Sequence, residues 1–406
     1  GECNSSLVGP FIGFHHNSVL ISALWFEGKG NIGYGANIGS NHTGRLPDQE
    51  CIPGEGIFFG LGCNVKYPCN LRRSPYSIVA SGVTLLPQRV EMPFSLINEQ
   101  AKCIEGVSPA FNEIFPGWVL YSNYYMVVRN EDKFRTRNKS QRSVIETALF
   151  RPETVAMMAA ARDRLSFATL GTDFLDLKTM KRAASATDTT LCLHSDVLPK
   201  AICNDPSTRA IPNDPSTRAI PNDPSARAIP NDPLAKAIPN DPTTNTIQKT
   251  VYLEGDIDGL GKNFLTEESR RNGVEAYSFM IRLYALRCVF QLMQSIFQEA
   301  EKPLMATLFR SEQWEGVQAL LRQECKRVML SEAAQNYVSL RKQLAERAVE
   351  SKKKDFVRGE HIDPSYLTTH SYTKDMAVID HFAAQIDREG TELTNLTNRL
   401  LLWNED

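Results

Sequence analysis

The sequence has few of the features that mark membrane or secreted proteins. No apolar run reaches the roughly 18 uncharged residues that cross a bilayer, and no charged-then-apolar leader is present. The nine cysteines include no CxxC pair and no metal-ligand spacing. Because an odd number of irregularly spaced cysteines is typical of reduced thiols, we expect a cytoplasmic protein.

The chain also lacks an excess of charge of either sign. Its 45 basic and 47 acidic residues leave a formal net charge of -2, which gives no electrostatic reason to expect a nucleic-acid or membrane partner. The nucleophile elbow, the Rossmann glycine fingerprint and the kinase motifs are missing as well. The hydrophobic fraction of 42% and the length of 406 residues are those of a globular protein with two or three domains.

What is present is a period of six residues. Ile32 and Ile38 are each followed by glycine, and Phe59, Val65 and Leu71 continue the same spacing. Neither a helix, with a period of 3.6, nor an alternating strand, with a period of 2, has this spacing. A chain that turns a corner every six residues and points one aliphatic side chain inward per face does have it. The pattern predicts a parallel β-helix over residues 1–98.

The limits of this β-helix follow from the same pattern. It is already running at Ile12, so we interpret residues 1–98 as part, or a shortened descendant, of a longer β-helix that lacks its earlier coils. Pro87 and Pro93 mark its end, since proline is tolerated at an edge that stops recruiting strands.

The rest of the chain is predicted to be mainly α-helical. Residues 99–145 form a transitional linker with a basic run, which is either solvated or able to grip phosphates, and residues 146–402 form a helical region. One helix is expected to begin after a Thr266 cap with acidic residues in its first turn. Further helical windows cover 312–330, 332–356 and 373–388.

A tandem repeat interrupts the helical region at 203–247. Its nonapeptide unit, Asn204-Asp-Pro-Ser-Thr-Arg-Ala-Ile-Pro212, contains two prolines and little apolar surface. Such a unit does not offset the entropy of ordering, so we predict a disordered insertion. A solenoid module or an Ile-Pro binding motif is the alternative.

Several segments carry a family resemblance. Residues 79–83 and 93–97 resemble the terminal coil of hexapeptide-repeat acyltransferases, whose fold is the left-handed parallel β-helix. Residues 39–50 and 53–56 resemble a bacterial family of unknown function that joins such a β-helix to a helical C-terminal region. The resemblance implies a homotrimer, with clefts between subunits.

The same resemblance implies a catalytic histidine on an ejected loop, and His42 lies on the long excursion between Ser40 and Gly56. A histidine near neutral pKa takes a proton from an acceptor and returns it later. Asp48 or Glu50 would orient its ring. Asn41 flanks His42, and Arg45 would bind an anionic group of the substrate. Alternatively, His42 caps a corner or hydrogen-bonds within its own loop.

Three further sites are candidates for substrate binding. His15 and His16 lie in the equivalent part of an earlier hexad, where stacking could bring one near His42, although a zinc site would need a third ligand and we expect no metal. Lys29, between glycines, is placed to approach phosphate. Arg72 and Arg73 would clamp a diphosphate or form salt bridges between subunits.

Together with the resemblance, these features imply a transferase that acts on a sugar nucleotide or on an acyl donor such as a coenzyme A thioester, with a small anionic substrate. The alternative is a non-catalytic trimeric scaffold or ligand-sensing module that binds a protein partner through its helices.

Overall fold

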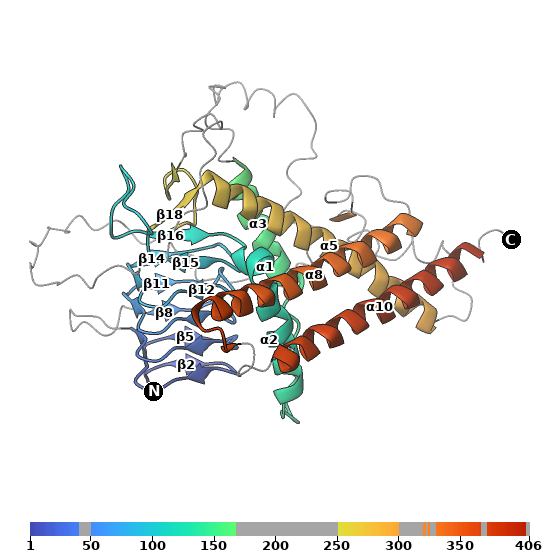
Figure 1. Ribbon diagram of the computed structural model, residues 1–406, viewed down its shortest axis with the longest axis horizontal. Helices are drawn as coiled ribbons and strands as arrows, with labels where there is room; N and C mark the ends of the chain where they lie inside the picture. The colour runs from blue at the N-terminus through green and yellow to red at the C-terminus, as the bar shows by residue number, and fades with distance from the viewer. Residues whose placement is uncertain are drawn as a thin grey trace, which may run out of the picture. The chain divides into compact units, whose positions relative to one another are not determined.

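The N-terminal quarter of the chain winds into stacked coils, each with three short strands. The computed structural model describes residues 1–39, 50–167, 251–299, 320–321, 324, 330–366 and 372–402 of the 406 (Figure 1). The statements below concern these residues. They belong to one compact unit formed by Gly1–Leu191 with Thr250–Asp406.

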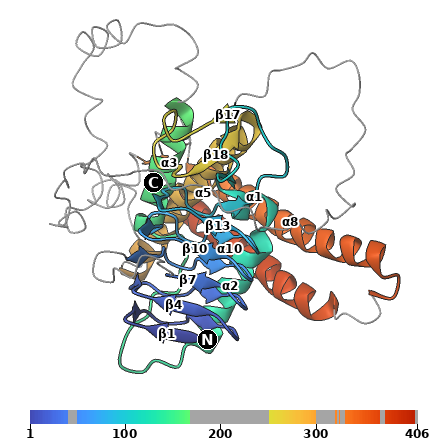
Figure 2. The same cartoon turned by 90° about the vertical axis from the view of Figure 1, so that its left-hand side faces the viewer.

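The coils stack their strands into three parallel faces, which Figures 1 and 2 show as ladders. The first face contains β1 (Glu2–Asn4), β4 (Val19–Ile21), β7 (Asn37–Ile38), β10 (Asn64–Val65) and β13 (Thr84–Leu85). The second contains β2 (Leu7–Val8), β5 (Leu24–Trp25), β8 (Cys51–Ile52), β11 (Cys69–Asn70) and β14 (Gln88–Arg89). The third contains β3 (Gly13–Phe14), β6 (Asn31–Ile32), β9 (Phe58–Phe59), β12 (Ile78–Val79) and β15 (Leu96–Asn98). The predicted parallel β-solenoid, of about five coils, is confirmed.

The six-residue period corresponds to the inward side chains of successive faces. Ile32 and Ile38, and likewise Phe59, Val65 and Leu71, are all almost fully buried. Each such side chain stabilises the fold by about 1.5–3 kcal/mol through burial. Stacking in register therefore gives the solenoid a continuous apolar axis.

At the corners before the first and third faces, residues in the left-handed backbone conformation lie two positions ahead of the strands. Before the third face these residues form a corner column: Phe11, Lys29, Gly56, Tyr76 and Phe94, with φ between 54° and 67°. Before the first face they are Asn17, Gly35, Gly62 and Gly82. Glycine adopts this conformation most readily and occupies four of these nine positions, whereas four of the five residues in the corner column have large side chains.

The last coil does not end as a bare edge. On the third face, β15 pairs antiparallel with β16 (Asn112–Phe115), which pairs with β18 (Asn263–Thr266), and β17 (Val251–Tyr252) completes the sheet. Our expectation that Pro87 and Pro93 stop strand recruitment is therefore wrong for this face. Neither proline lies in β15, whose backbone groups stay available to β16.

Helices follow the solenoid. They are α1 (Trp118–Ser122), α2 (Tyr124–Arg137), α3 (Pro152–Phe167), α5 (Glu267–Glu299), α8 (Leu330–Ile362) and α10 (Tyr372–Leu402). The stretch 99–145, expected to be a linker, contains β16, α1 and α2, because Tyr124, Val128 and Phe134 bury a helical face between its charges. None of the described helices has the length and apolar character needed to cross a bilayer.

Two predictions for the helical region have different outcomes. Thr266 caps α5 as expected, since its hydroxyl accepts a hydrogen bond from the backbone N–H of Ser269 at 3.2 Å. The nonapeptide insertion at 203–247 and most of the window 312–330 lie outside the described residues. Helices α8 and α10 run side by side (Figure 1).

Candidate functional site

The solenoid has one greatly enlarged corner, between its first and second faces. Two residues separate Ile21 from Leu24 at this corner in one coil, and three separate Val65 from Cys69 in another. Between Ile38 and Cys51 there are twelve. A corner that departs this far from its neighbours is where a solenoid is expected to carry function.

The strands on either side of the enlarged corner keep their register. Asn37 pairs with Asn64, and Cys51 pairs with Cys69. A hydrogen bond also joins the coils on either side of the enlarged corner, since the Tyr67 hydroxyl donates to the carbonyl of Ile21. The extra residues therefore enter the chain without displacing the core of the neighbouring coils.

Most of the predicted catalytic group falls in this corner. Asn41, His42, Arg45 and Asp48 lie outside the described residues, whereas Glu50 is exposed immediately before β8. The structure therefore fixes where the chain leaves and re-enters the solenoid at this corner.

His15 and His16 lie at a different corner. They follow β3, between the third and first faces, and both are exposed. The carbonyl of His15 accepts a hydrogen bond from the Ser18 hydroxyl at 2.7 Å. Among the residues that the structure describes, no group of three or more histidine, cysteine or acidic side chains could hold a metal ion.

Lys29 lies at the third corner, in the corner column, and its ammonium is buried. Its Nζ is 2.5 Å from Oε1 of Glu55, which also accepts hydrogen bonds from the Tyr76 hydroxyl at 2.8 Å and from Arg151. We call Lys29, Glu55, Tyr76 and Arg151 the corner clamp. Because the ammonium already has a buried carboxylate partner, the geometry favours a structural role over the predicted contact with phosphate.

The electrostatics of the corner clamp follow from its contacts. Burial alone would raise the pKa of Glu55, but hydrogen bonds and charge from Arg151 and Lys29 outweigh it and lower that pKa. Burial raises the pKa of the Tyr76 hydroxyl well above its usual value, and the adjacent Glu55 carboxylate adds to this. Glu55 therefore stays ionised and Tyr76 stays protonated near neutral pH.

Arg72 and Arg73 lie at the same corner on the surface. The guanidinium of Arg72 is 3.9 Å from Glu27, which lies at the same corner two coils away, at the weak end of an ion pair. The Nε of Arg73 is 3.5 Å from a carboxylate oxygen of Glu91. Both contacts join different coils of one chain, and those of Arg73 and Glu91 are neighbours.

Besides Arg73, Glu91 contacts residues that the sequence analysis did not single out. Its carboxylate contacts Arg89 at 3.7 Å and is hydrogen-bonded by Arg164 of α3, while Arg89 also donates a hydrogen bond to Asp258 at 3.0 Å. We call Arg73, Arg89, Glu91, Arg164 and Asp258 the Glu91 cluster. The sequence gives no signal for it, because Asp258 follows Arg89 by 169 residues.

The predicted site residues thus occupy three separate corners of the solenoid. Glu50 lies at the first, His15 and His16 at the second, and Lys29, Arg72 and Arg73 at the third. Among the residues that the structure describes, Lys29, Arg72 and Arg73 therefore share a corner but lie apart from Glu50 and the two histidines.

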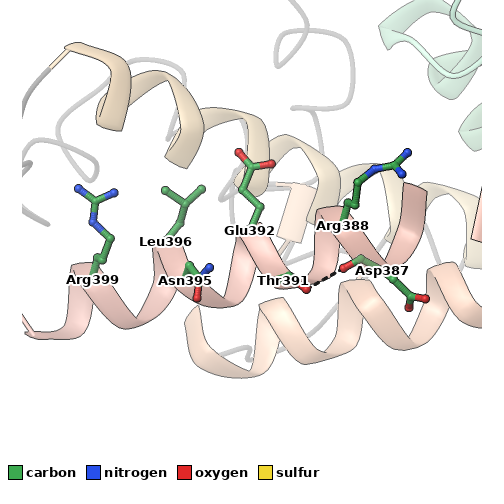
Figure 3. Close-up of a pocket in the computed structure, with 7 residues that line it drawn as sticks. All are labelled: Asp387, Arg388, Thr391, Glu392, Asn395, Leu396 and Arg399. Carbon is green, nitrogen blue, oxygen red and sulfur yellow. Dashed lines mark hydrogen bonds between the residues drawn. The ribbon is translucent and has the colours of Figure 1, made fainter. Parts of the chain in front are cut away.

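Two hollows lie on the helical region. The first, about 590 Å³, follows one side of α10 (Figure 3) and is lined by Asp387, Arg388, Thr391, Glu392, Asn395, Leu396 and Arg399. The second, about 910 Å³, lies between α8 and α10 and is lined largely by polar and small residues. Neither lining contains a histidine, a cysteine or a tyrosine. Their ionisable lining side chains are carboxylates, arginine and lysine, among them Asp387, Glu392 and Glu346.

Comparison with known proteins finds a partial similarity to an uncharacterized protein. No family model and no solved structure matches the chain. An uncharacterized protein of Treponema pallidum (strain Nichols) is 31% identical over 158 residues, which cover 38% of this chain and 20% of that relative. The chain thus spans about a fifth of the length of the relative it matches. This similarity assigns no activity to the chain. The fold class is assigned from the solenoid itself.

Proposed function

We propose that this chain is a transferase of the left-handed hexapeptide-repeat type, acting on a sugar nucleotide or an acyl donor with His42 as general base. The observation that carries the proposal is the corner of twelve residues between Ile38 and Cys51, in a solenoid whose other corners there use two or three. This corner contains His42, the residue type best suited to move a proton near neutral pH.

The reaction assigns one role to each polar group. In the acyl case, the acceptor hydroxyl or amine attacks the thioester carbonyl while His42 takes its proton. The C–S bond breaks, and His42 passes the proton to the departing thiolate of coenzyme A. Asp48 or Glu50 holds the imidazole, and Asn41 and Arg45 bind the substrate.

A second chain is part of the proposal. Glu50, His15 and Arg73 lie at different corners of one chain, and a neighbouring copy would bring a second group of them to the enlarged corner. A homotrimer with clefts between subunits meets this need. His15 and His16 would then face the cleft from the neighbouring chain, with Arg72 and Arg73 as anion ligands.

A scaffold is the second candidate, and a specific observation favours it. Lys29 is committed to a buried ion pair, and the two hollows of α8 and α10 suit contact with a protein partner. In this case the helices bind the partner, and His42 has no chemical role.

The test compares His42→Ala with a matched control, His361→Ala, whose side chain is exposed on α8. Product formation from nucleotide-sugar and acyl-coenzyme A donors is followed by mass spectrometry, and the assembly mass by light scattering. We expect His42→Ala alone to lose turnover, with the trimer mass unchanged in both variants. Turnover that survives His42→Ala, or a monomeric mass for the unaltered chain, would overturn the proposal.

A further inference from the structure

The Glu91 cluster places three guanidinium groups around one carboxylate. Glu91 is 9% exposed, and Arg73, Arg89 and Arg164 reach it from β11's corner, β14 and α3. With Asp258 included, three positive charges face two negative ones. The cluster keeps a local positive charge although the chain as a whole is slightly acidic.

Two of the three guanidiniums are open to solvent. The side chains of Arg73 and Arg89 are 50% and 53% exposed, and their contacts with Glu91, at 3.5 and 3.7 Å, are longer than hydrogen bonds to a charged partner usually are. A guanidinium has five donors in a planar fork that matches phosphate oxygens. Glu91 therefore orients Arg73 and Arg89 while leaving most of their donors for a ligand.

Asp258 is the group that a ligand would displace. Its carboxylate bridges Arg89 at 3.0 Å and Arg164 at 3.9 Å, yet its side chain is 63% exposed. The loop that carries it is fixed independently, because the N–H of Glu91 donates to the carbonyl of Gly259 at 2.9 Å. An exposed ion pair of this kind contributes little stability, so a phosphate with two charges can replace the carboxylate without moving the loop.

We propose that Arg73, Arg89 and Arg164 form a binding site for a phosphate or diphosphate group, which Asp258 occupies when no ligand is bound. Glu91 sets the geometry of the site, and Arg73 and Arg89 supply its solvent-facing donors. The assignment deepens the proposed function by naming where a phosphorylated donor is held, and its biological ligand rests on that function. Binding of the anion itself does not require His42.

The experiment is isothermal titration of the full chain with inorganic pyrophosphate at constant ionic strength. The Arg73→Ala/Arg89→Ala variant should weaken binding at least tenfold, since it removes charge-assisted hydrogen bonds. Asp258→Asn, which removes the competing charge, should tighten binding about two- to fivefold. The control is Arg135→Ala, an exposed arginine of α2 that pairs with Asp132, and it should bind as the unaltered chain does.

Three results would overturn the assignment: no binding of pyrophosphate by the unaltered chain, equal binding by the double arginine variant, or no tightening in Asp258→Asn. His42→Ala separates this proposal from the catalytic one. If the anion site exists but the chain is no transferase, the unaltered chain and His42→Ala bind pyrophosphate equally, and neither protein forms product.

Discussion

Arg151 and Glu55 are 96 residues apart in the sequence, yet the guanidinium donates hydrogen bonds to both oxygens of the carboxylate. Lys29 contacts the same carboxylate from the neighbouring coil. The pair joins the solenoid to the residue that precedes α3, so a buried charge connects the two parts of the fold.

Removing the charge of Glu55 should destabilise the protein strongly. Glu55→Gln leaves Lys29 and Arg151 without their buried counterion, and we expect a loss of about 3–5 kcal/mol in the free energy of unfolding, measured with urea. Asp132→Asn, the same change in an exposed pair with Arg135, should cost less than about 1 kcal/mol. Equal losses in the two variants would contradict a structural role for the corner clamp.

Two corner glycines should respond differently to alanine. Both Gly56 and Gly62 have positive φ, 67° and 64°, so either substitution costs roughly 1–2 kcal/mol in backbone strain. A Cβ at Gly62 meets nothing within 4 Å, whereas at Gly56 it would lie 2.2 Å from the ring of Tyr76. Because that ring is buried and its hydroxyl is held by Glu55, Gly56→Ala should cost about 1–3 kcal/mol more than Gly62→Ala. Similar urea midpoints for the two variants would mean that Tyr76 can move.

The start of α5 should make stability depend on pH. Hydrogen bonds from Arg270, then Arg271 and Tyr252, lower the pKa of Glu267 to about 2, against about 4.3 in an unfolded chain. The ionised Glu267 carboxylate therefore makes its full contribution to the free energy of unfolding above about pH 4.3, and this contribution is lost as the pH falls toward 2. Glu267→Gln should be about 1 kcal/mol less stable at pH 7, and the difference should shrink across that window.

The control for this series is Glu268→Gln, which changes an exposed carboxylate in the same turn. It should leave the unfolding free energy almost unchanged at every pH. If the deficit of Glu267→Gln were as large at pH 2 as at pH 7, the ion pairs of Glu267 would not be its source.

The enlarged corner should be removable. Deleting residues 40–49 leaves Gly39 and Glu50 between Ile38 and Cys51, which matches the two-residue corner between Ile21 and Leu24. Since the flanking strands are in register with their neighbours, we expect a melting temperature within about 2 °C of the full chain, a change of roughly 1–2 kcal/mol. Turnover should be lost. A deletion variant that fails to fold would show that the corner supports the core.

Much of the fold was predictable because its signals are local. The six-residue period gave the solenoid, and the Thr266 cap gave the start of α5. The continuation of the sheet through β16 was not predictable, because which strand covers an edge depends on tertiary packing.

For the candidate site, too, the local features were predictable and the tertiary contacts were not. A histidine in a long excursion is visible in the sequence, but the partners of Lys29 and Arg73 are not. Glu55 and Glu91 become their counterions only when coils stack, and Arg151 and Arg164 arrive from beyond the solenoid. The expectation that Lys29 approaches phosphate could not include Glu55 and Arg151, which come together at this corner only in the folded chain.

The central claim, that the solenoid binds a phosphorylated or acyl-coenzyme A donor for transfer, is tested most directly by the melting temperature of the unaltered chain with each donor. A ligand that binds only the folded state raises this temperature. We predict that at least one nucleotide sugar or acyl-coenzyme A raises it in the full chain, and by less in the chain without residues 40–49. If no donor at millimolar concentration shifts the full chain, or if the deletion variant shifts equally, the claim is contradicted.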